Sequence, residues 1–344
     1  MISNRIILTV VVLLFLSSST STAQEKRFAF AFYNLENLFD THHDTGKYDW
    51  EYTPTGNKRW TKDRYKKKIN NLAFVIDKLG KPHCPEGITI LGVGEVENKQ
   101  ALTDLIRNKH IAKRKFGFVH HESPDARGID VALIYEAKVF KVLSSKAYPL
   151  NKIKNQQVRT RYQLLVKGVL NQRDTLHIIV NHWPSRKDKR NVEQRDYAAK
   201  LTKRIADSIL QSNTKAKIVI MGDFNDNPDN RSCRVILNAK RNKTDVKKGG
   251  LYNPMWNIYK KGIGTYCYQG WWNMYDQFII SESLIAPSGK NKGLAFTKAE
   301  VCRFDFLLQK QGKYKGYPLR TFSGNIFLNG YSDHLPIVSY FERR

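Results

Sequence analysis

Hydrophobic and polar positions follow two different periods along the chain, and these periods predict strands and helices. Residues 27–36 (RFAFAFYNLE) are typical of a strand, and the apolar run 88–96 (ITILGVGEV) is typical of a buried strand. In residues 61–79, by contrast, apolar side chains recur about every 3.6 positions, which predicts a helix. The apolar positions of this helix are Tyr65, Ile69, Leu72, Val75, Ile76 and Leu79. Its start, TKDRYKKK (61–68), is expected to be a solvated basic face.

The remaining elements continue this alternation. A second long helix is predicted at 192–210, where apolar residues lie four apart on one face, and a short helix is predicted at 101–109. Strands are predicted at 116–121, 129–135, 139–144, 162–170, 176–180, 217–221, 277–280 and 336–341. The chain is otherwise rich in loops after residue 229. Many strands with few helices indicate an α/β fold in which sheets pack face to face and helices lie outside.

The N-terminus has the pattern of a secretory signal peptide. Arg5 precedes the apolar run 6–16, and small polar residues follow up to Ala23, where we expect cleavage. The run is well short of the roughly 20 residues that cross a bilayer, although an uncleaved membrane anchor is the alternative. We therefore expect a secreted or periplasmic protein whose residues 24–344 fold as one domain, since no repeat or low-complexity linker divides them.

The charge balance points to a polyanionic partner. Lys and Arg number 58 against 31 Asp and Glu, a formal net charge of +27. Such an excess favours nucleic acid, through counterion release, or an anionic lipid surface. A basic surface that serves only solubility explains the charge equally well. Nothing in the sequence indicates a stable protein partner.

The four cysteines do not predict a metal site. Cys84, Cys233, Cys267 and Cys302 are too far apart in sequence to form the close ligand pairs of zinc sites. An exported protein can oxidise them in any of three full pairings, and buried free thiols are the alternative.

Polar side chains gather where the predicted strands end. They are Asn34 and Glu36, Glu95 and Glu97, Asp130 in GIDVALIY, Asn181 and His182 in NHWPSR, Asp223 and Asn225 in MGDFND, Asp276 before QFII, and Asp333 and His334 in SDHLPI. Singly, such residues have ordinary explanations, such as an Asp that closes a turn or a structural His. Their recurrence at so many strand ends predicts one shared cleft.

These residue types suit the hydrolysis of a phosphoester. Carboxylates and amides are oxygen ligands for hard cations such as Mg²⁺ or Ca²⁺, and such cations stabilise phosphoryl oxygens. A His beside an Asp carries protons, and an Asp–Asn pair orients water and donates a hydrogen bond. The chain has no G-x-S-x-G or C-x-x-C signature, no P-loop and no complete G-x-G-x-x-G motif.

In order and spacing, the motifs FYNLEN, GVGEVEN, GIDVALIY, NHWPSR, GDFND, YDQFII and SDHLPI resemble those of the endonuclease/exonuclease/phosphatase superfamily. That superfamily includes deoxyribonuclease I, exonuclease III, sphingomyelinases and inositol polyphosphate phosphatases. The motifs span residues 28–341, nearly all of the expected mature chain. The resemblance implies a four-layered α/β/β/α sandwich of two mixed or antiparallel sheets with outer helices.

The resemblance also implies a metal site. Asn34, Glu95 and Asp333 would bind the ion, and Glu36 would be a further acidic residue there. Mg²⁺ is the expected ion, with Mn²⁺ or Ca²⁺ as alternatives.

Roles in the reaction follow from the same motifs. His334 would be the catalytic His paired with Asp276, and Asp223 and Asn225 would hold the water and the phosphate. His182 would be the second His, oriented by Asp130. Asn181 and Arg127 are predicted to contact substrate, although a surface role for Arg127 is an equal alternative.

Neighbouring aromatic and His residues have a structural interpretation. Trp271, Trp272 and Tyr275 precede Asp276 and have the chemistry to stack on bases, but core positions are favoured. His120 and His121 point to opposite faces of a strand and are interpreted as structural.

Two departures narrow the substrate class. Residues 226–228 follow GDFN with Asp-Asn-Pro, whereas inositol phosphatases have Tyr-Arg there. His182 stands where abasic-site endonucleases usually have Tyr, so the site resembles the two-His arrangement of deoxyribonuclease I and sphingomyelinases. We predict a metal-dependent nuclease for DNA or RNA. The alternative is an exported phosphodiesterase or phosphatase for membrane lipid or small phosphoesters. A catalytically silent binding module is disfavoured because every expected position is filled.

Overall fold

The computed structural model describes residues 26–343 except 151, 154–155, 187–189 and 286–292. The predicted signal peptide, residues 1–23, lies outside this range and stays a prediction. Within the described part of the chain, no helix combines the length and hydrophobicity required to cross a membrane.

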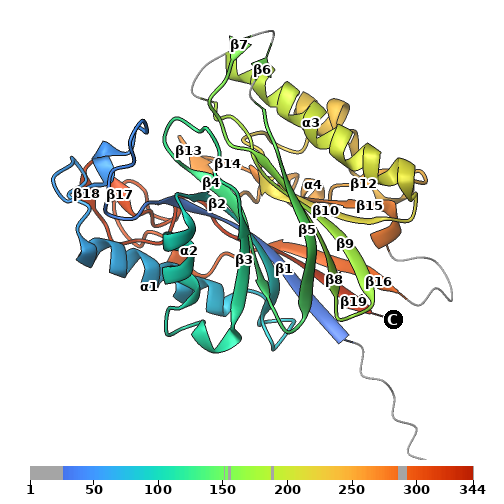
Figure 1. Ribbon diagram of the computed structural model, residues 1–344, viewed down its shortest axis with the longest axis horizontal. Helices are drawn as coiled ribbons and strands as arrows, with labels where there is room; N and C mark the ends of the chain where they lie inside the picture. The colour runs from blue at the N-terminus through green and yellow to red at the C-terminus, as the bar shows by residue number, and fades with distance from the viewer. Residues whose placement is uncertain (1–25, 151, 154–155, 187–189, 286–292, 344) are drawn as a thin grey trace, which may run out of the picture.

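Two large sheets form the centre of the protein (Figure 1). The first has the order β16-β19-β1-β2-β4-β3, and the second has the order β11-β12-β15-β10-β9-β8-β5. The first sheet contains β1 (Lys26–Leu38), β2 (Ile88–Val96), β3 (Phe116–His120), β4 (Asp130–Glu136), β16 (Leu294–Val301) and β19 (Ile337–Arg343). The second contains β5 (Phe140–Tyr148), β8 (Gln163–Leu170), β9 (Asp174–His182), β10 (Lys217–Asp223), β11 (Ala239–Lys240), β12 (Leu251–Tyr252) and β15 (Asp276–Ser281).

Each sheet has a parallel pair of strands at its centre, and β11 and β12 form a second parallel pair at one edge of the second sheet. β1 runs parallel to β2 in the first sheet, and β9 runs parallel to β10 in the second. The described residues also form three two-stranded ribbons: β6 (Lys152–Ile153) with β7 (Gln156–Gln157), β13 (Tyr266–Tyr268) with β14 (Trp271–Asn273), and β17 (Phe322–Ser323) with β18 (Ile326–Phe327).

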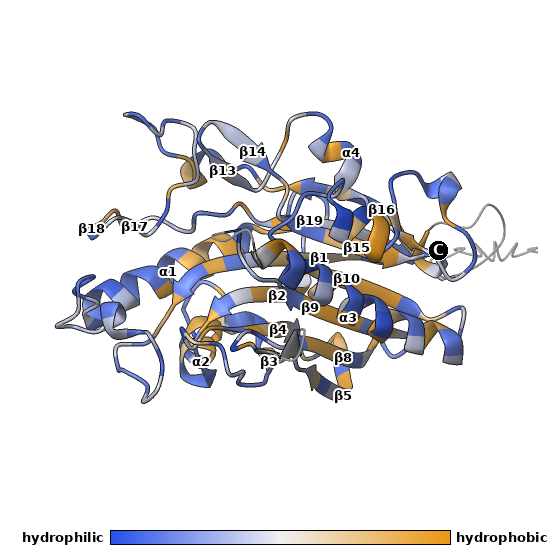
Figure 2. Ribbon diagram, turned by 90° about the horizontal axis from the view of Figure 1, so that it is seen from above, coloured by the Kyte–Doolittle hydropathy of each residue, from blue (hydrophilic) through white to orange (hydrophobic). Residues whose placement is uncertain are grey.

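The alternation of side chains along β1 shows how the layers pack. Phe28, Phe30 and Phe32 enter the core between the two sheets. The intervening Ala29 and Ala31 face the opposite way, toward helix α1 (Lys62–Lys78) and helix α2 (Lys99–Ile106). Helix α3 (Arg190–Ser212) covers the outer face of the second sheet, and α4 (Met255–Tyr259) is a short peripheral helix. The predicted four-layered sandwich is therefore confirmed, and Figure 2 shows polar residues on the outer sides of α1 and α3.

Two sequence expectations need correction. The region after residue 229 contains β16, which pairs with β19 at the edge of the first sheet and was not predicted. The predicted basic face of α1 is not wholly solvated, because Lys68 is buried. Its ammonium donates to Thr321 Oγ1 and to the Tyr331 carbonyl, both at 2.6 Å, and lies 3.8 Å from Glu36. Burial lowers the pKa of Lys68 to about 8.

All four cysteines lie within the described residues, and each is a buried free thiol.

Gly222 permits a close approach of the parallel strands β9 and β10. A Cβ atom at this position would lie 2.2 Å from the Asn181 carbonyl oxygen, which is a backbone atom that cannot rotate away. β9 and β10 would have to separate directly beside Asp223. The glycine of the GDFN motif is therefore required for packing.

We expect Gly222→Ala to lower the free energy of unfolding by roughly 3 kcal/mol or more, because it forces backbone displacement in a packed sheet. Urea unfolding followed by circular dichroism measures the change. Gly249→Ala is the matched control: Gly249 has φ +71° and no atom within 4 Å of the added Cβ. Its cost should be only about 1–2 kcal/mol, from backbone conformation alone. Equal losses in both variants would contradict the close-approach explanation.

Candidate active site at the ends of the central strands

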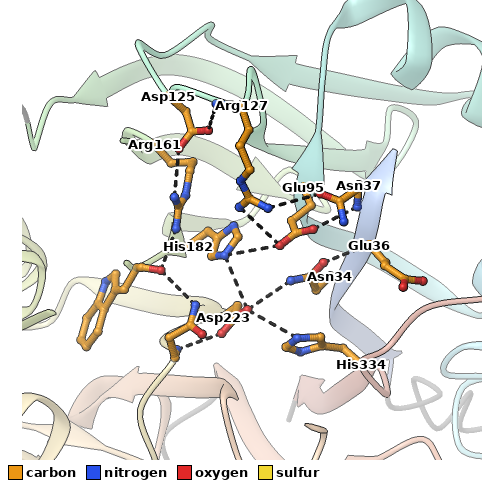
Figure 3. A network of polar contacts seen from close by, with 12 residues as sticks. Asn34, Glu36, Asn37, Glu95, Asp125, Arg127, Arg161, His182, Asp223 and His334 are labelled. Atoms are coloured by element: carbon orange, nitrogen blue, oxygen red, sulfur yellow. Dashed lines mark hydrogen bonds and ion pairs between the residues drawn. The ribbon is translucent and has the colours of Figure 1, made fainter. Parts of the chain in front are cut away.

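The candidate site lies where the parallel pairs of the two facing sheets end. Asp223 is the last residue of β10, opposite His182 of β9 on one side and Asp276 of β15 on the other. Asn34 of β1 reaches Asp223 across the gap between the sheets, with its Nδ2 3.1 Å from Asp223 Oδ2. Figure 3 shows Asn34 and His182 converging on Asp223. The strand ends therefore meet around one carboxylate.

The backbone around the site adopts left-handed conformations at four residues that are not glycine. Glu36, Asn37, Glu95 and Asn225 have φ values of 50°, 52°, 59° and 49°. Each costs on the order of 1 kcal/mol and persists only where the surroundings enforce it. The register of β2 against β4 shifts between Gly94 and Val96, so Glu95 is the extra residue of a bulge. Bulges of this kind re-aim a side chain, and here Glu95 is directed at the site.

Asp223 is the hub of the site. Its Oδ2 lies 3.6 Å from His182 Nε2 and 3.8 Å from His334 Nε2, while its Oδ1 accepts a hydrogen bond from the Asn225 amide at 2.8 Å. Burial raises the pKa of Asp223 to about 7, since the lowering effect of His334 only partly opposes it. A carboxyl group with this pKa can exchange a proton near neutral pH.

His334 is held by a second carboxylate. Its Nδ1 lies 2.7 Å from Asp276 Oδ2, and the pair is buried. Burial by itself would lower the pKa of His334, but Asp276 and Asp223 outweigh burial and raise that pKa well above its ordinary value. The two carboxylates therefore favour the protonated form of His334. The structure places Asp276 beside His334, which is the pairing that the sequence resemblance implies.

His182 has the opposite protonation state. Burial lowers the pKa of His182 well below its ordinary value, and the cations Arg161 and Arg127 lower it further. Its Nδ1 has no hydrogen-bond partner among the described residues, while its Nε2 faces Asp223 and lies 3.8 Å from Glu95 Oε1. The pKa values of the two imidazoles that flank Asp223 are thus shifted in opposite directions. Opposite shifts of this kind allow one residue to act as an acid and another as a base at the same pH.

Glu95 connects the site to its rim. Its Oε2 accepts a hydrogen bond from the Asn37 amide at 3.0 Å, and its Oε1 lies 3.7 Å from Arg127 Nη2. Arg127 also donates to Asn37 Oδ1 at 3.3 Å. The structure therefore places Arg127, whose position the sequence left open, at the edge of the site.

Two more arginines line the rim, and the sequence did not single them out. Arg186 donates to the Asn225 carbonyl at 2.8 Å, and Arg320 donates to Asp333 Oδ2 at 2.7 Å. The side chains of Arg127, Arg186 and Arg320, which we call the rim arginines, are 38%, 39% and 42% exposed. Arg186 belongs to the NHWPSR motif, which is a signal that could have identified it.

The oxygen donors fit a divalent cation. Glu95 contributes its Oε1, which lies 3.7 Å from Arg127 Nη2 and 3.8 Å from His182 Nε2. Asn34 contributes an amide oxygen that accepts only from the Glu36 amide, at 2.9 Å, among the described contacts. Hard oxygen donors of this kind suit Mg²⁺, Mn²⁺ or Ca²⁺. Asp333 precedes His334 in the sequence. Its Oδ2 accepts from Arg320, which leaves Oδ1 as the oxygen that could bind a cation.

A second group of donors could also hold an ion. Asp223, Asp276 and His334 place one ligand atom each within 4.8 Å of one another. The hydrogen bond between His334 and Asp276 already occupies one nitrogen of that imidazole, however. This hydrogen bond favours a proton-carrying pair at His334 and Asp276, and Asn34 and Glu95 are a second set of residues that could hold a cation.

Three predicted site residues have other partners. Asp130 contacts His120 Nε2 at 3.0 Å and accepts from the Ser123 amide, so it does not orient His182. His120 itself is buried in this pair, as its structural interpretation requires. Asn181 is fully buried, and its Oδ1 accepts from Trp183 Nε1 at 3.1 Å, which removes it from contact with substrate.

Glu36 is the third. Its Oε2 accepts from the Thr321 amide at 2.6 Å, its Oε1 accepts from Arg320 at 3.3 Å, and Lys68 lies 3.8 Å away. Figure 3 shows its carboxylate directed away from Asp223. Its charge is balanced by these two cations, so the structure does not support Glu36 as a metal ligand.

Comparisons with known proteins agree with this geometry. A family model described as the endonuclease/exonuclease/phosphatase family matches residues 29–343. No curated protein sequence matches the chain significantly.

Solved structures share the fold at low sequence identity. A mannosyl-6-phosphatase from Bacteroides thetaiotaomicron VPI-5482 has 13% identity and a TM-score of 0.54, with 91% of this chain and 99% of that chain covered. D. rerio TDP2 complexed with a single-strand DNA product has 12% identity and a TM-score of 0.52, covering 92% and 98%. An endonuclease/exonuclease/phosphatase family protein from B. thetaiotaomicron has 12% identity and a TM-score of 0.54, covering 93% and 96%. Because the family model spans nearly all of the chain that folds around Asp223, the protein belongs to the endonuclease/exonuclease/phosphatase family.

Proposed function

We propose that the protein is a divalent-metal-dependent nuclease that hydrolyses phosphodiester bonds of DNA or RNA. The observation that carries the proposal is the placement of one buried carboxylate, Asp223, between the imidazoles of His334 and His182. The rim arginines and the net charge of +27 favour a polyanionic substrate over a small neutral one. We further propose that the chain is exported after cleavage near Ala23.

The residues would divide the reaction as follows. Asn34 and Glu95, with Asp333, would hold the cation, which would polarise a phosphoryl oxygen and stabilise its developing charge. Asp223, with a pKa of about 7, would orient the attacking water and accept its proton as the new P–O bond forms. The bond from phosphorus to the leaving alcohol oxygen would break, and that oxygen would take a proton from solvent. Charged His334, kept in place by Asp276, would stabilise negative charge on the phosphoryl group, and His182 would donate a hydrogen bond to it.

A panel assay tests the proposal. Plasmid DNA, RNA, sphingomyelin, a sugar phosphate and bis(p-nitrophenyl) phosphate are each incubated with and without Mg²⁺. Mg²⁺-dependent cleavage of DNA or RNA is expected. Hydrolysis of sphingomyelin or the sugar phosphate, with both nucleic acids left intact, would favour the alternative of a lipid or small-phosphoester hydrolase. The fold shared with a mannosyl-6-phosphatase makes the sugar phosphate a necessary arm.

If nucleic acid is the substrate, KM should rise steeply with salt. Three rim arginines that each neutralise one phosphate would raise KM roughly 20- to 40-fold between about 50 and about 200 mM salt. KM for bis(p-nitrophenyl) phosphate should change little, because that substrate reaches the centre without several phosphate contacts. Initial rates over a salt series measure both values. A flat response for DNA would contradict recognition through its backbone.

A further inference from the structure

An exposed aromatic pair lies at the tip of the β13–β14 hairpin. Tyr268 and Trp271 are cross-strand partners, so their side chains share one face of the hairpin. They are 58% and 77% exposed. The other face carries Cys267 and Trp272, which pair with each other and turn inward, and the guanidinium of Arg303 lies 4.5 Å over the ring of Trp272. Of the tryptophans that the sequence assigned to the core, Trp271 is therefore outside it.

The hairpin is fixed in place, so the exposure of this pair is not the result of a loose loop. The Gly270 amide at its turn donates to the Tyr317 hydroxyl at 2.5 Å. At its base, Asn227 Nδ2 donates to Asn273 Oδ1 at 3.1 Å, and the Thr265 amide donates to the Asn273 carbonyl at 2.8 Å. Rigid aromatic rings bind a ligand at low entropic cost because they are already ordered.

The hairpin starts at the reaction centre. Tyr266 forms a β-bridge with His334, and the two rings lie 4.9 Å apart. Tyr268 is two strand residues further along, which is roughly 7 Å. A chain whose phosphate lies beside His334 would therefore bring a neighbouring base to the Tyr268 and Trp271 pair. Figure 2 shows the hairpin at the periphery, outside the two large sheets.

The surface beside the hairpin is strongly basic. Residues 303–320 contain five cations and one acid, Asp305. The cations are Arg303, Lys310, Lys313, Lys315 and Arg320. The segment is joined to the hairpin through Tyr317 and Arg303, and it carries the exposed Tyr314. Aromatic faces among cations are the combination that binds single-stranded nucleic acid, because each base can stack while each phosphate is neutralised.

We propose that the solvent face of the β13–β14 hairpin, formed by Tyr268 and Trp271, is a base-stacking subsite for single-stranded nucleic acid adjoining the scissile phosphate. This inference rests on the proposed nuclease function and adds the strand form of the substrate to it. A membrane surface is the competing partner for exposed Trp and Tyr. The tip has only two rings, both with polar groups, and the residues between them are Gln269 and Gly270. A tip with no aliphatic side chain has little to insert into lipid.

Fluorescence anisotropy of a labelled single-stranded oligonucleotide tests the subsite without requiring turnover. The double variant Tyr268→Ala/Trp271→Ala should bind at least about fivefold more weakly than the wild type, and Trp271→Phe should retain most of the affinity because it keeps a ring. Leu143→Ala, which removes an exposed apolar side chain on the edge strand β5, is the control and should bind normally. Hydrolysis of bis(p-nitrophenyl) phosphate should be unchanged in Leu143→Ala.

The outcomes separate this inference from the function on which it rests. Unchanged oligonucleotide binding in the double variant, or an equal loss in Leu143→Ala, would overturn the subsite. Binding of anionic phosphatidylserine vesicles that depends on Trp271, with oligonucleotide binding intact, would overturn it in favour of a membrane contact. Absence of wild-type hydrolysis of any phosphoester would refute the proposed function instead, and the anisotropy result would still decide the subsite.

Discussion

Replacing His334 by alanine is expected to reduce kcat on a phosphodiester by about 10²- to 10⁴-fold. The substitution removes the positive charge that Asp276 and Asp223 maintain beside the reacting group, and no other imidazole can replace it because His182 is neutral. Steady-state kinetics with bis(p-nitrophenyl) phosphate measure the loss independently of nucleic-acid binding.

His120→Ala is the matched control for this prediction. His120 forms an equally buried pair with a carboxylate, Asp130 at 3.0 Å, on a neighbouring strand of the first sheet. Its removal should cost stability in urea unfolding and leave kcat per folded molecule close to the wild-type value. If His334→Ala keeps wild-type turnover, or if both variants lose activity in proportion to unfolding, His334 has no catalytic role.

Removal of divalent cations should have an effect of similar size. With excess EDTA, turnover should fall below detection, and Mg²⁺ or Mn²⁺ should restore it, because the phosphoryl charge would otherwise be stabilised by side chains alone. Full activity in chelator would exclude a metal-dependent reaction.

Two acidic residues identify where the ion binds. Glu95→Gln should raise the Mg²⁺ concentration for half-maximal activity by at least about tenfold, since it removes a ligand charge. Glu36→Gln should leave that concentration unchanged, because the carboxylate of Glu36 is engaged by Lys68 and Arg320. Both residues have left-handed backbone near strand ends, so the comparison isolates the direction of the side chain. A shift in Glu36→Gln alone would reverse the assignment.

The sequence predicted elements well where one face or both faces of an element are apolar. The inward aromatic residues of β1 and the periodic apolar stripe of α1 are signals that tertiary packing reinforces. β16 was missed because it is an edge strand in which Thr297, Lys298 and Glu300 interrupt the apolar pattern. Edge strands bury less surface, and their sequences are correspondingly less periodic.

Site residues were predictable as a group and less so as pairs. The strand-end positions of Asp223, His182 and His334 were readable because motifs and strand ends coincide. The pairing of Asp130 with His120 was not predictable, because it depends on the register between β3 and β4. The contact between Lys68 and Glu36 was not predictable either, because it depends on how α1 packs against the first sheet. The sequence of α1 predicted only a solvated basic face around Lys68.

The left-handed residues at the site imply a trade-off between thermal stability and catalysis. At Glu95 and Asn225 the chain retains side chains where glycine would relax the backbone. Selection for thermal stability alone would therefore favour glycine at these positions, although glycine would remove the side chains that face the substrate. The backbone at the candidate site is strained, and packing in the rest of the sandwich must offset the free-energy cost of that strain.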